Sequence, residues 1–222
     1  MTYIVERVTI EVVSAIACFI LVRFMIKPFQ LTGETRYLGL PLGFGFLGAS
    51  YVYSALSYSS IINFHDNPLV QLFGRAFAFL FLAVTYYFSK SKKKPTLLWN
   101  TTLGVLTAIL TILILFAIIS PQFIESNYRL TQISVRIFTL ICLSYIAIHA
   151  LKSHIEKPDP ATLMVPLGYI LLGIGQYSVL IWAVDGGVFA FFGALALRLA
   201  GLVVFLYVSY CTFYISEKRG NK

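Results

Sequence analysis

The chain has 222 residues, of which 59% are hydrophobic and 12% are charged, and its mean hydropathy is +0.83. Soluble domains carry about 25% charged residues, so this composition excludes an ordinary soluble enzyme and indicates a protein that lies mostly in lipid. The net charge is +8, because 17 Lys and Arg residues outnumber 9 Asp and Glu residues. About 20 apolar residues cross a bilayer as a helix, so this length allows roughly seven crossings with short connections.

Seven apolar segments follow one another along the chain, and each is long enough to cross a membrane. Polar or turn-forming clusters separate them, such as those at 30–34 and 185–187. Continuous apolar segments indicate helices, since a membrane β-barrel requires alternating ones. We therefore predict an all-α, polytopic membrane protein with seven transmembrane helices at 8–28, 37–62, 68–89, 96–119, 128–150, 162–184 and 188–215.

The basic residues predict how these helices are oriented. If successive helices alternate in direction, 12 of the 17 Lys and Arg residues fall on one side, including the cluster Lys90 to Lys94, and only Arg7 and Arg129 fall on the other. Cytoplasmic loops carry the excess of basic residues, so we expect the N-terminus outside and the C-terminus in the cytoplasm. The lysine cluster follows a predicted helix, where lysines anchor the chain against anionic lipid, so we expect no nucleic-acid partner.

Two parts of the chain resemble each other. A shift of 125 residues aligns Pro-Leu-Gly-Phe at 41–44 with Pro-Leu-Gly-Tyr at 166–169, and each proline begins a predicted helix, where a first-turn proline suits helix entry. A shift of 123 residues aligns Arg75 with Arg198. The two units enter the membrane from the same side, so we predict a parallel repeat about an axis along the membrane normal. The predicted single domain has a 3+1+3 organisation, with a first repeat at 1–90, a linker helix at 95–120 and a second repeat at 127–216.

This 3+1+3 arrangement with an outside N-terminus is similar to that of the SWEET and PQ-loop carriers of sugars and amino acids. The Pro-Gln dipeptide of the PQ-loop group is absent from the first and fifth helices, and Pro121-Gln122 lies in the loop before the fifth. The segment Gly-Phe-Leu-Gly-Ala-Ser-Tyr at 45–51, the run that begins at Arg75 and Tyr86-Tyr87 together resemble the seven-helix membrane sensor regions of prokaryotic signalling proteins. The first resemblance implies a small-solute transporter, and the second implies a sensor.

Four ionisable residues lie inside predicted helices: Glu11, Arg75, Arg136 and Arg198. A charge at the bilayer centre costs about 2.5–3.5 kcal/mol on insertion scales, so each needs a partner or water. Counted from the outer ends of their helices, all four lie about 5–15 Å below the outer surface, and we expect them to share one layer. Under the shift of 125 residues Glu11 falls on Arg136, which gives the two halves opposite charges at equivalent places.

Polar side chains accompany these charges. A glutamine lies one helical turn before each of two arginines and shares a helix face with it. Arginine binds carboxylates and phosphates through paired donors, so a net positive, aromatic-rimmed layer predicts an outward-opening pocket for a small polar or anionic ligand. The predicted ligand-binding residues are Glu11, Arg75, Arg136, Arg198, Gln71, Gln132, Tyr51 and Gln176. In the alternative interpretation, Glu11 forms a structural ion pair with Arg75 or Arg198, and Arg136 extends to the outer head groups.

The remaining residues do not indicate catalysis. The three histidines and three cysteines have no spacing typical of a metal site or a disulfide framework, so we expect no enzyme activity, no metal and no cofactor. We expect a multi-pass protein of the cell membrane whose partners are the lipid bilayer, a small polar or anionic ligand, and a membrane protein or a second copy of the chain. A sensor-like or accessory subunit is the expected role, and a small-solute transporter is the alternative. Because the inner halves of the third and seventh helices are apolar or aromatic, we expect the pocket to be closed towards the cytoplasm.

Overall fold

The computed structural model describes residues 4–59, 68–89, 96–119, 128–156 and 160–212. Within these ranges the secondary structure is helical, which confirms the predicted all-α class. The elements are α1 (Ile4–Met25), α2 (Lys27–Thr32), the 3-10 helix η1 (Thr35–Leu38), α3 (Gly39–Tyr58), α4 (Pro68–Ser89), α5 (Thr96–Ile119), α7 (Tyr128–Glu156), α8 (Pro160–Asp185) and α9 (Val188–Tyr210).

Six helical segments of the described chain are long and apolar enough to cross a membrane: α1 continued through α2, α4, α5, α7, α8 and α9. The chain is therefore a multi-pass membrane protein by length and composition. The second predicted crossing corresponds to α3, which has 20 residues but contains several serines and tyrosines and is not among the six. That crossing stays a prediction. The orientation also stays a prediction, and the cluster Lys90 to Lys94 on which it partly rests lies outside the described residues.

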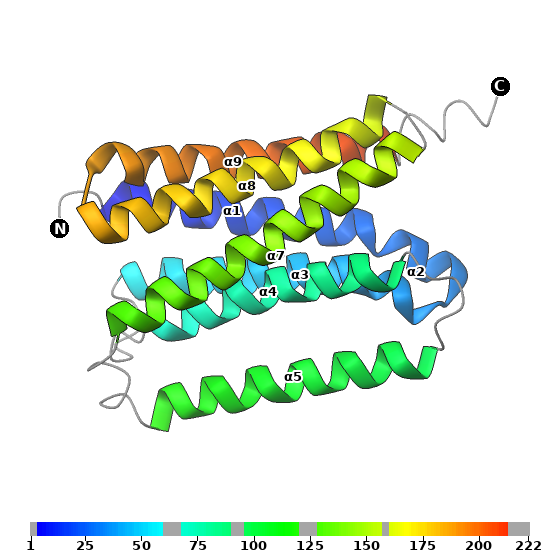
Figure 1. Cartoon of the computed structure of the whole chain (residues 1–222), viewed down its shortest axis with the longest axis horizontal. Coiled ribbons are helices and arrows are strands. Elements are labelled where there is room, and N and C mark those ends of the chain that lie inside the picture. Colours follow the sequence, from blue (N-terminus) through cyan, green and yellow to red (C-terminus); the bar gives the residue numbers. More distant parts are fainter. Residues whose placement is uncertain (1–3, 60–67, 90–95, 120–127, 157–159, 213–222) are drawn as a thin grey trace.

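Six helices pack side by side in a closed ring. Their order around the ring is α1, α3, α4, α7, α8 and α9, and α9 packs against α1 again. α5 lies outside this ring and packs mainly on α4, and Figure 1 shows it standing apart from the other helices. Only 11% of its apolar segment is buried, compared with 56% for α4, so most of the surface of α5 is left for lipid. Successive long helices alternate in direction, which places the start of α1 and the end of α9 at opposite ends of the bundle (Figure 1).

The interior of the ring is filled by apolar side chains. Aromatic rings make part of it, with Phe205 packed edge-on against Tyr169 at 4.6 Å and against Phe44 at 5.5 Å between ring centroids. The cluster draws on all six ring helices, and its members include Cys18, Leu21, Phe44, Leu47, Phe79, Leu82, Leu143, Ile146, Leu172, Leu202 and Phe205. We call this cluster the apolar core. It fills the middle of the bundle with no charged side chain among its members.

The two halves of the ring make equivalent close contacts. A Cβ atom at Gly43 of α3 would lie 2.5 Å from Leu82 Cδ2 of α4, and one at Gly168 of α8 would lie 2.8 Å from the Phe205 ring of α9. Gly43 aligns with Gly168 under the shift of 125 residues, and Leu82 aligns with Phe205 under the shift of 123. These contacts, and the ring order, are what a two-fold repeat requires, and the repeat itself stays a prediction.

Several helix boundaries differ from those expected, and those of α7 and α8 have a clear physical reason. Pro41 is the third residue of α3, in the first turn as predicted, but Pro166 lies inside α8 because that helix begins at Pro160. Pro160 suits the first position of a helix, whereas Pro166 leaves one backbone carbonyl of the first turns without its helical donor. α7 extends to Glu156, beyond the predicted end at 150. Polar residues therefore continue α7 past its apolar segment.

Candidate functional site

Glu11 of α1 connects two arginines that come from different helices. Its Oε2 accepts a hydrogen bond from Arg75 Nη2 of α4 at 3.0 Å, and its Oε1 accepts one from Arg198 Nη1 of α9 at 3.1 Å. Glu11 is 2% exposed and Arg198 is 7% exposed, so their ion pair is shielded from solvent and lipid, whereas the Arg75 side chain is 21% exposed. The structure thus brings together three of the four charges predicted to share a layer. The predicted ion pair is present, and it involves both arginines.

Helical periodicity explains why these charges face the inside of the ring. On α1 the buried residues Glu11, Ser14, Ala15 and Cys18 recur at three- and four-residue intervals, which places them on one helix face. On α9 Arg198 likewise lies within a buried face of small and apolar residues. Neither helix can turn its charge outwards without also exposing its packing face.

The Tyr51 ring of α3 lies beside both guanidinium groups. The Arg75 Cζ atom is 4.9 Å from the ring centroid and the Arg198 Cζ atom is 4.7 Å from it. Tyr51 is completely buried, and its hydroxyl has no hydrogen-bond partner in the part of the chain that the structure describes. The negative face of an aromatic ring attracts cations, so Tyr51 partly offsets the positive charge that Glu11 does not neutralise.

A chain of hydrogen bonds extends from Arg75 along α3 and α4. Arg75 Nη2 donates to Ser54 Oγ at 2.7 Å, and Ser54 Oγ donates to Gln71 Oε1 at 3.0 Å. Tyr58 donates to the same Gln71 oxygen at 3.2 Å, and Arg7 of α1 donates to the Tyr58 hydroxyl. The Arg7 guanidinium also lies over the Tyr58 ring, 3.7 Å from its centroid. The network therefore runs from the middle of α4 to the first turns of α1.

The sequence-based prediction omitted Arg7 from this network and counted it only among the residues of the outer side. A signal for it was present, because Arg7 precedes Glu11 by four residues and therefore lies one turn away on the same helix face. Ser54 and Tyr58 were recognised as part of a polar outer half of the second predicted helix, but they were not among the predicted ligand-binding residues. Ser54 follows Tyr51 by three residues and Tyr58 follows Ser54 by four, so all three lie on one face of α3.

The other predicted residues are less closely joined to Glu11. Arg136 of α7 is half-buried and lies within electrostatic range of Arg75 and Arg7, but it makes no hydrogen bond to any described residue. Gln132 and Gln176 are also half-buried, and neither is hydrogen-bonded within the described ranges. The structure therefore unites five of the eight predicted residues in one contact network, which are Glu11, Arg75, Arg198, Tyr51 and Gln71.

Positive charge exceeds negative charge in this part of the ring. Glu11 lies within electrostatic range of Arg7, Arg75 and Arg198, and Arg136 is near Arg75. Among the described residues, this group of neighbouring charges therefore contains one carboxylate and four guanidinium groups, a net charge of +3, although Arg136 itself is not within range of Glu11. The Nε atoms of Arg75, Arg136 and Arg198, and Nη2 of Arg198, are buried and donate to no described residue. Buried donors are nearly always paired in proteins, so these groups are suited to hold an anion or ordered water.

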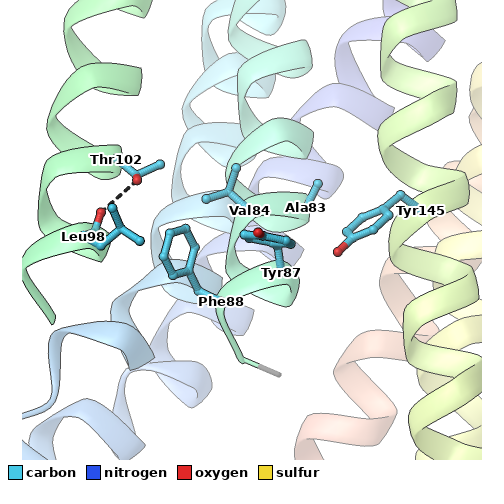
Figure 2. A pocket seen from close by; sticks show the side chains of 7 residues that line it. All are labelled: Ala83, Val84, Tyr87, Phe88, Leu98, Thr102 and Tyr145. Atoms are coloured by element: carbon cyan, nitrogen blue, oxygen red, sulfur yellow. Dashed lines mark hydrogen bonds between the residues drawn. The ribbon is translucent and has the colours of Figure 1, made fainter. Parts of the chain in front are cut away.

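A groove of about 440 Å³ lies near the opposite end of the bundle, where α4, α5 and α7 meet. Figure 2 shows Tyr87 at its centre, between Phe88 on the side of α5 and Tyr145 on α7. Thr102 contributes a hydroxyl, which donates to the Leu98 carbonyl at 2.8 Å. Its lining has no charged side chain and is almost entirely apolar. The groove therefore differs in chemistry from the arginine-rich site.

Comparisons of the chain with family models, with curated proteins and with solved structures found no match. The chemistry of the site is therefore the basis for a functional proposal.

Proposed function

We propose that this chain is a non-enzymatic membrane protein that binds a small polar or anionic ligand from the outer side of the membrane, in a sensor-like or accessory role. One observation carries the proposal: two arginines bind a single buried carboxylate, two more arginines lie close to this group, and several guanidinium donors have no partner among the described residues. Uncompensated charge in a membrane interior is costly, and an anionic ligand would reduce that cost.

The apolar core supports a site that is accessible from one side. It begins one helical turn beyond Arg75 with Phe79, and one turn beyond Arg198 with Leu202. Both residues lie towards the predicted cytoplasmic end, so a ligand among the arginines would meet closely packed apolar side chains there. A receptor can function with such a site, whereas a carrier must expose its site alternately to both faces.

Glu11 provides a physical means of coupling ligand binding to helix arrangement. It connects α1 with α4 of the same half and with α9 of the other half. An anion that competes with Glu11 for either arginine would change the relative stability of the packed arrangements of the two halves. A membrane partner, or a second copy of the chain, would then detect that change.

The test is a ligand screen with the purified protein, followed by uptake measurements in liposomes. Small carboxylates, phosphates, sugars and amino acids are screened for a rise in melting temperature, and each ligand that binds is tested for transport. We expect binding that Arg75→Ala and Arg198→Ala abolish, without saturable uptake. Arg129→Ala is the control, because Arg129 is exposed at the start of α7. If none of the four classes binds, the proposal is wrong.

A small-solute transporter is the second candidate. The equivalent contacts of Gly43 with Leu82 and of Gly168 with Phe205 favour it, because carriers with parallel repeats move one half against the other. Saturable uptake that requires Arg75 or Arg198 would establish this candidate in place of the receptor.

A further inference from the structure

Arg198 presents one complete edge of its guanidinium group that no described residue occupies. Its Nη1 donates to Glu11, whereas Nε and Nη2 are both buried and have no partner in the described ranges. The N–H bonds of Nε and Nη2 lie along one side of the planar group and point in nearly the same direction. Two parallel donors of this kind match the two oxygens of a carboxylate, which accepts both bonds at once.

The local charge indicates the charge of the ligand. Glu11 neutralises one of the two arginines that it contacts, so Glu11, Arg75 and Arg198 together have a net charge of +1. One further negative charge would balance the group. A monoanion meets this requirement, whereas a dianion such as hydrogen phosphate would leave an excess of negative charge within these three residues.

The relation between the two halves suggests why this charge is missing from the chain. Position 136 is equivalent to position 11, but it is occupied by arginine rather than by a carboxylate. The first half thus supplies an acid for the two arginines and the second half does not. No other residue of the described ranges supplies a second carboxylate to these arginines, so a ligand can provide it.

The neighbours of Arg198 indicate the rest of the ligand. Ala194, Leu195 and Leu202 lie one turn before and after Arg198 on the same face of α9, and all three are buried and apolar. A ligand held at Arg198 therefore meets apolar side chains beyond its charged group. Hydroxyl or amino groups on that part of the ligand would find no partners on this face of α9.

We propose that the Nε–Nη2 edge of Arg198 binds a small aliphatic monocarboxylate, which serves as the second carboxylate of the Glu11, Arg75 and Arg198 group. This inference rests on the proposed function and narrows its ligand class.

The test compares acetate with acetamide, chloride and inorganic phosphate, using calorimetry on the purified protein in detergent at constant ionic strength. Acetamide has nearly the same shape as acetate but no charge. We expect acetate to bind at least about tenfold more tightly than each of the other probes, because only acetate combines two oxygens and one negative charge with an apolar methyl group. The Arg198→Lys variant keeps the charge but not the paired donors, so acetate should bind at least about tenfold more weakly to it. Arg129→Lys makes the same change at an exposed site and should bind acetate as the unmodified chain does.

A measurement on the unmodified chain makes the test independent of the folding of any variant. Solid-state NMR with 13C-carboxyl acetate and 15N-labelled arginine reports whether the carboxyl carbon lies within direct contact of a guanidinium Nε. The inference is overturned if no such contact appears, if acetamide binds like acetate, or if a folded Arg198→Lys variant binds acetate unchanged. If phosphate, sugars or amino acids bind while acetate does not, this inference fails and the proposed function stands. If no probe of any class binds, both fail.

Discussion

Glu11 is the only acidic residue that is buried in the described ranges, and it neutralises charge on two helices at once. Removing one partner from a buried ion pair leaves the other charge uncompensated, which costs about 3–5 kcal/mol. Here the loss of one carboxylate would leave both Arg75 and Arg198 without their negatively charged partner. Arg75 would keep its hydrogen bond to Ser54, and both guanidinium groups would keep their contact with Tyr51, but neither interaction replaces a negative charge.

We therefore predict that Glu11→Gln lowers the free energy of unfolding by about 3–5 kcal/mol. Thermal melting or denaturant titration in detergent would measure the loss. Glu6→Gln is the matched control, because Glu6 is an exposed acid in the first turn of the same helix and should change stability by less than about 0.5 kcal/mol.

A second substitution separates the two contacts of Glu11. Adding Arg75→Gln or Arg198→Gln to Glu11→Gln should restore part of the lost stability, since each removes one uncompensated charge. Strict additivity for both arginines would contradict the pairing, because independent residues show additive effects and contacting residues do not.

For individual residues, the sequence predicts which side chains are buried and charged better than it predicts which of them are in contact. The need to neutralise Glu11, Arg75 and Arg198 in a membrane leads to an ion pair at their common depth. Which arginine pairs with Glu11 depends on the order of the helices around the ring, which hydropathy does not determine. The contact of Arg7 with Tyr58 was missed for the same reason, since it depends on α1 lying beside α3.

Among the elements, the pairs α3 with α4 and α8 with α9 each pack closely at a point where a glycine faces a large apolar side chain. Gly168 lies against the Phe205 ring, which is itself held by Tyr169 and Phe44 and cannot move aside. Gly43 lies against Leu82, which is fully buried. Small residues at such positions let membrane helices come into direct backbone contact.

We predict that Gly43→Ala and Gly168→Ala each destabilise the fold by about 1–3 kcal/mol, because the new methyl group overpacks the helix pair. Unfolding titrations in detergent would measure the effect. The control is Gly104→Ala in α5, where a Cβ atom would meet nothing within 4 Å. It should be neutral or stabilise the helix by up to about 1 kcal/mol, since alanine is the better helix former. Equal effects at all three glycines would contradict the close packing.

The length of the apolar segments predicts where the helices lie, but it predicts only some of their ends. α4 and α5 correspond to the predicted segments 68–89 and 96–119, because polar residues flank both. α7 and α8 are longer than predicted, because polar residues such as Lys152 and prolines such as Pro160 are compatible with a helix outside its apolar segment. Hydropathy therefore indicates which part of a helix lies in lipid, and not where the helix stops.

For the whole molecule, the charge bias predicts which end of the bundle faces the cytoplasm. α8 ends at Asp185, at the end of the bundle where α1 begins, and α7 ends at Glu156, at the opposite end (Figure 1). In a variant that lacks Cys18, Cys142 and Cys211, we predict that Asp185→Cys reacts with a membrane-impermeant maleimide in intact cells. Glu156→Cys should react only after the cells are permeabilised. The reverse pattern would invert the orientation and place the arginine site near the cytoplasm.

The arrangement of the helices in space is the part of the fold that the sequence could not supply. The alignment of Arg75 with Arg198 predicts two related halves, but it does not say that six helices close a ring or that α5 stays outside it. Those features depend on how side chains such as Leu82 and Phe205 fit against facing glycines. Composition describes each helix by itself, whereas the ring depends on how the side chains of neighbouring helices fit together.

The position of α5 outside the ring follows from the directions of the two ring helices that it connects. α4 and α7 are neighbours in the ring and run in the same direction, as do α9 and α1 (Figure 1). A continuous chain can join the end of one helix to the start of a parallel neighbour only by a segment that returns along the length of the bundle. α5 is that returning segment between α4 and α7. No such return is needed between α9 and α1, because these two helices do not follow one another in the sequence. Two separate polypeptides, one for each half, would form the same ring without α5, whereas a circularly permuted chain joining the present ends would require a second helix like it.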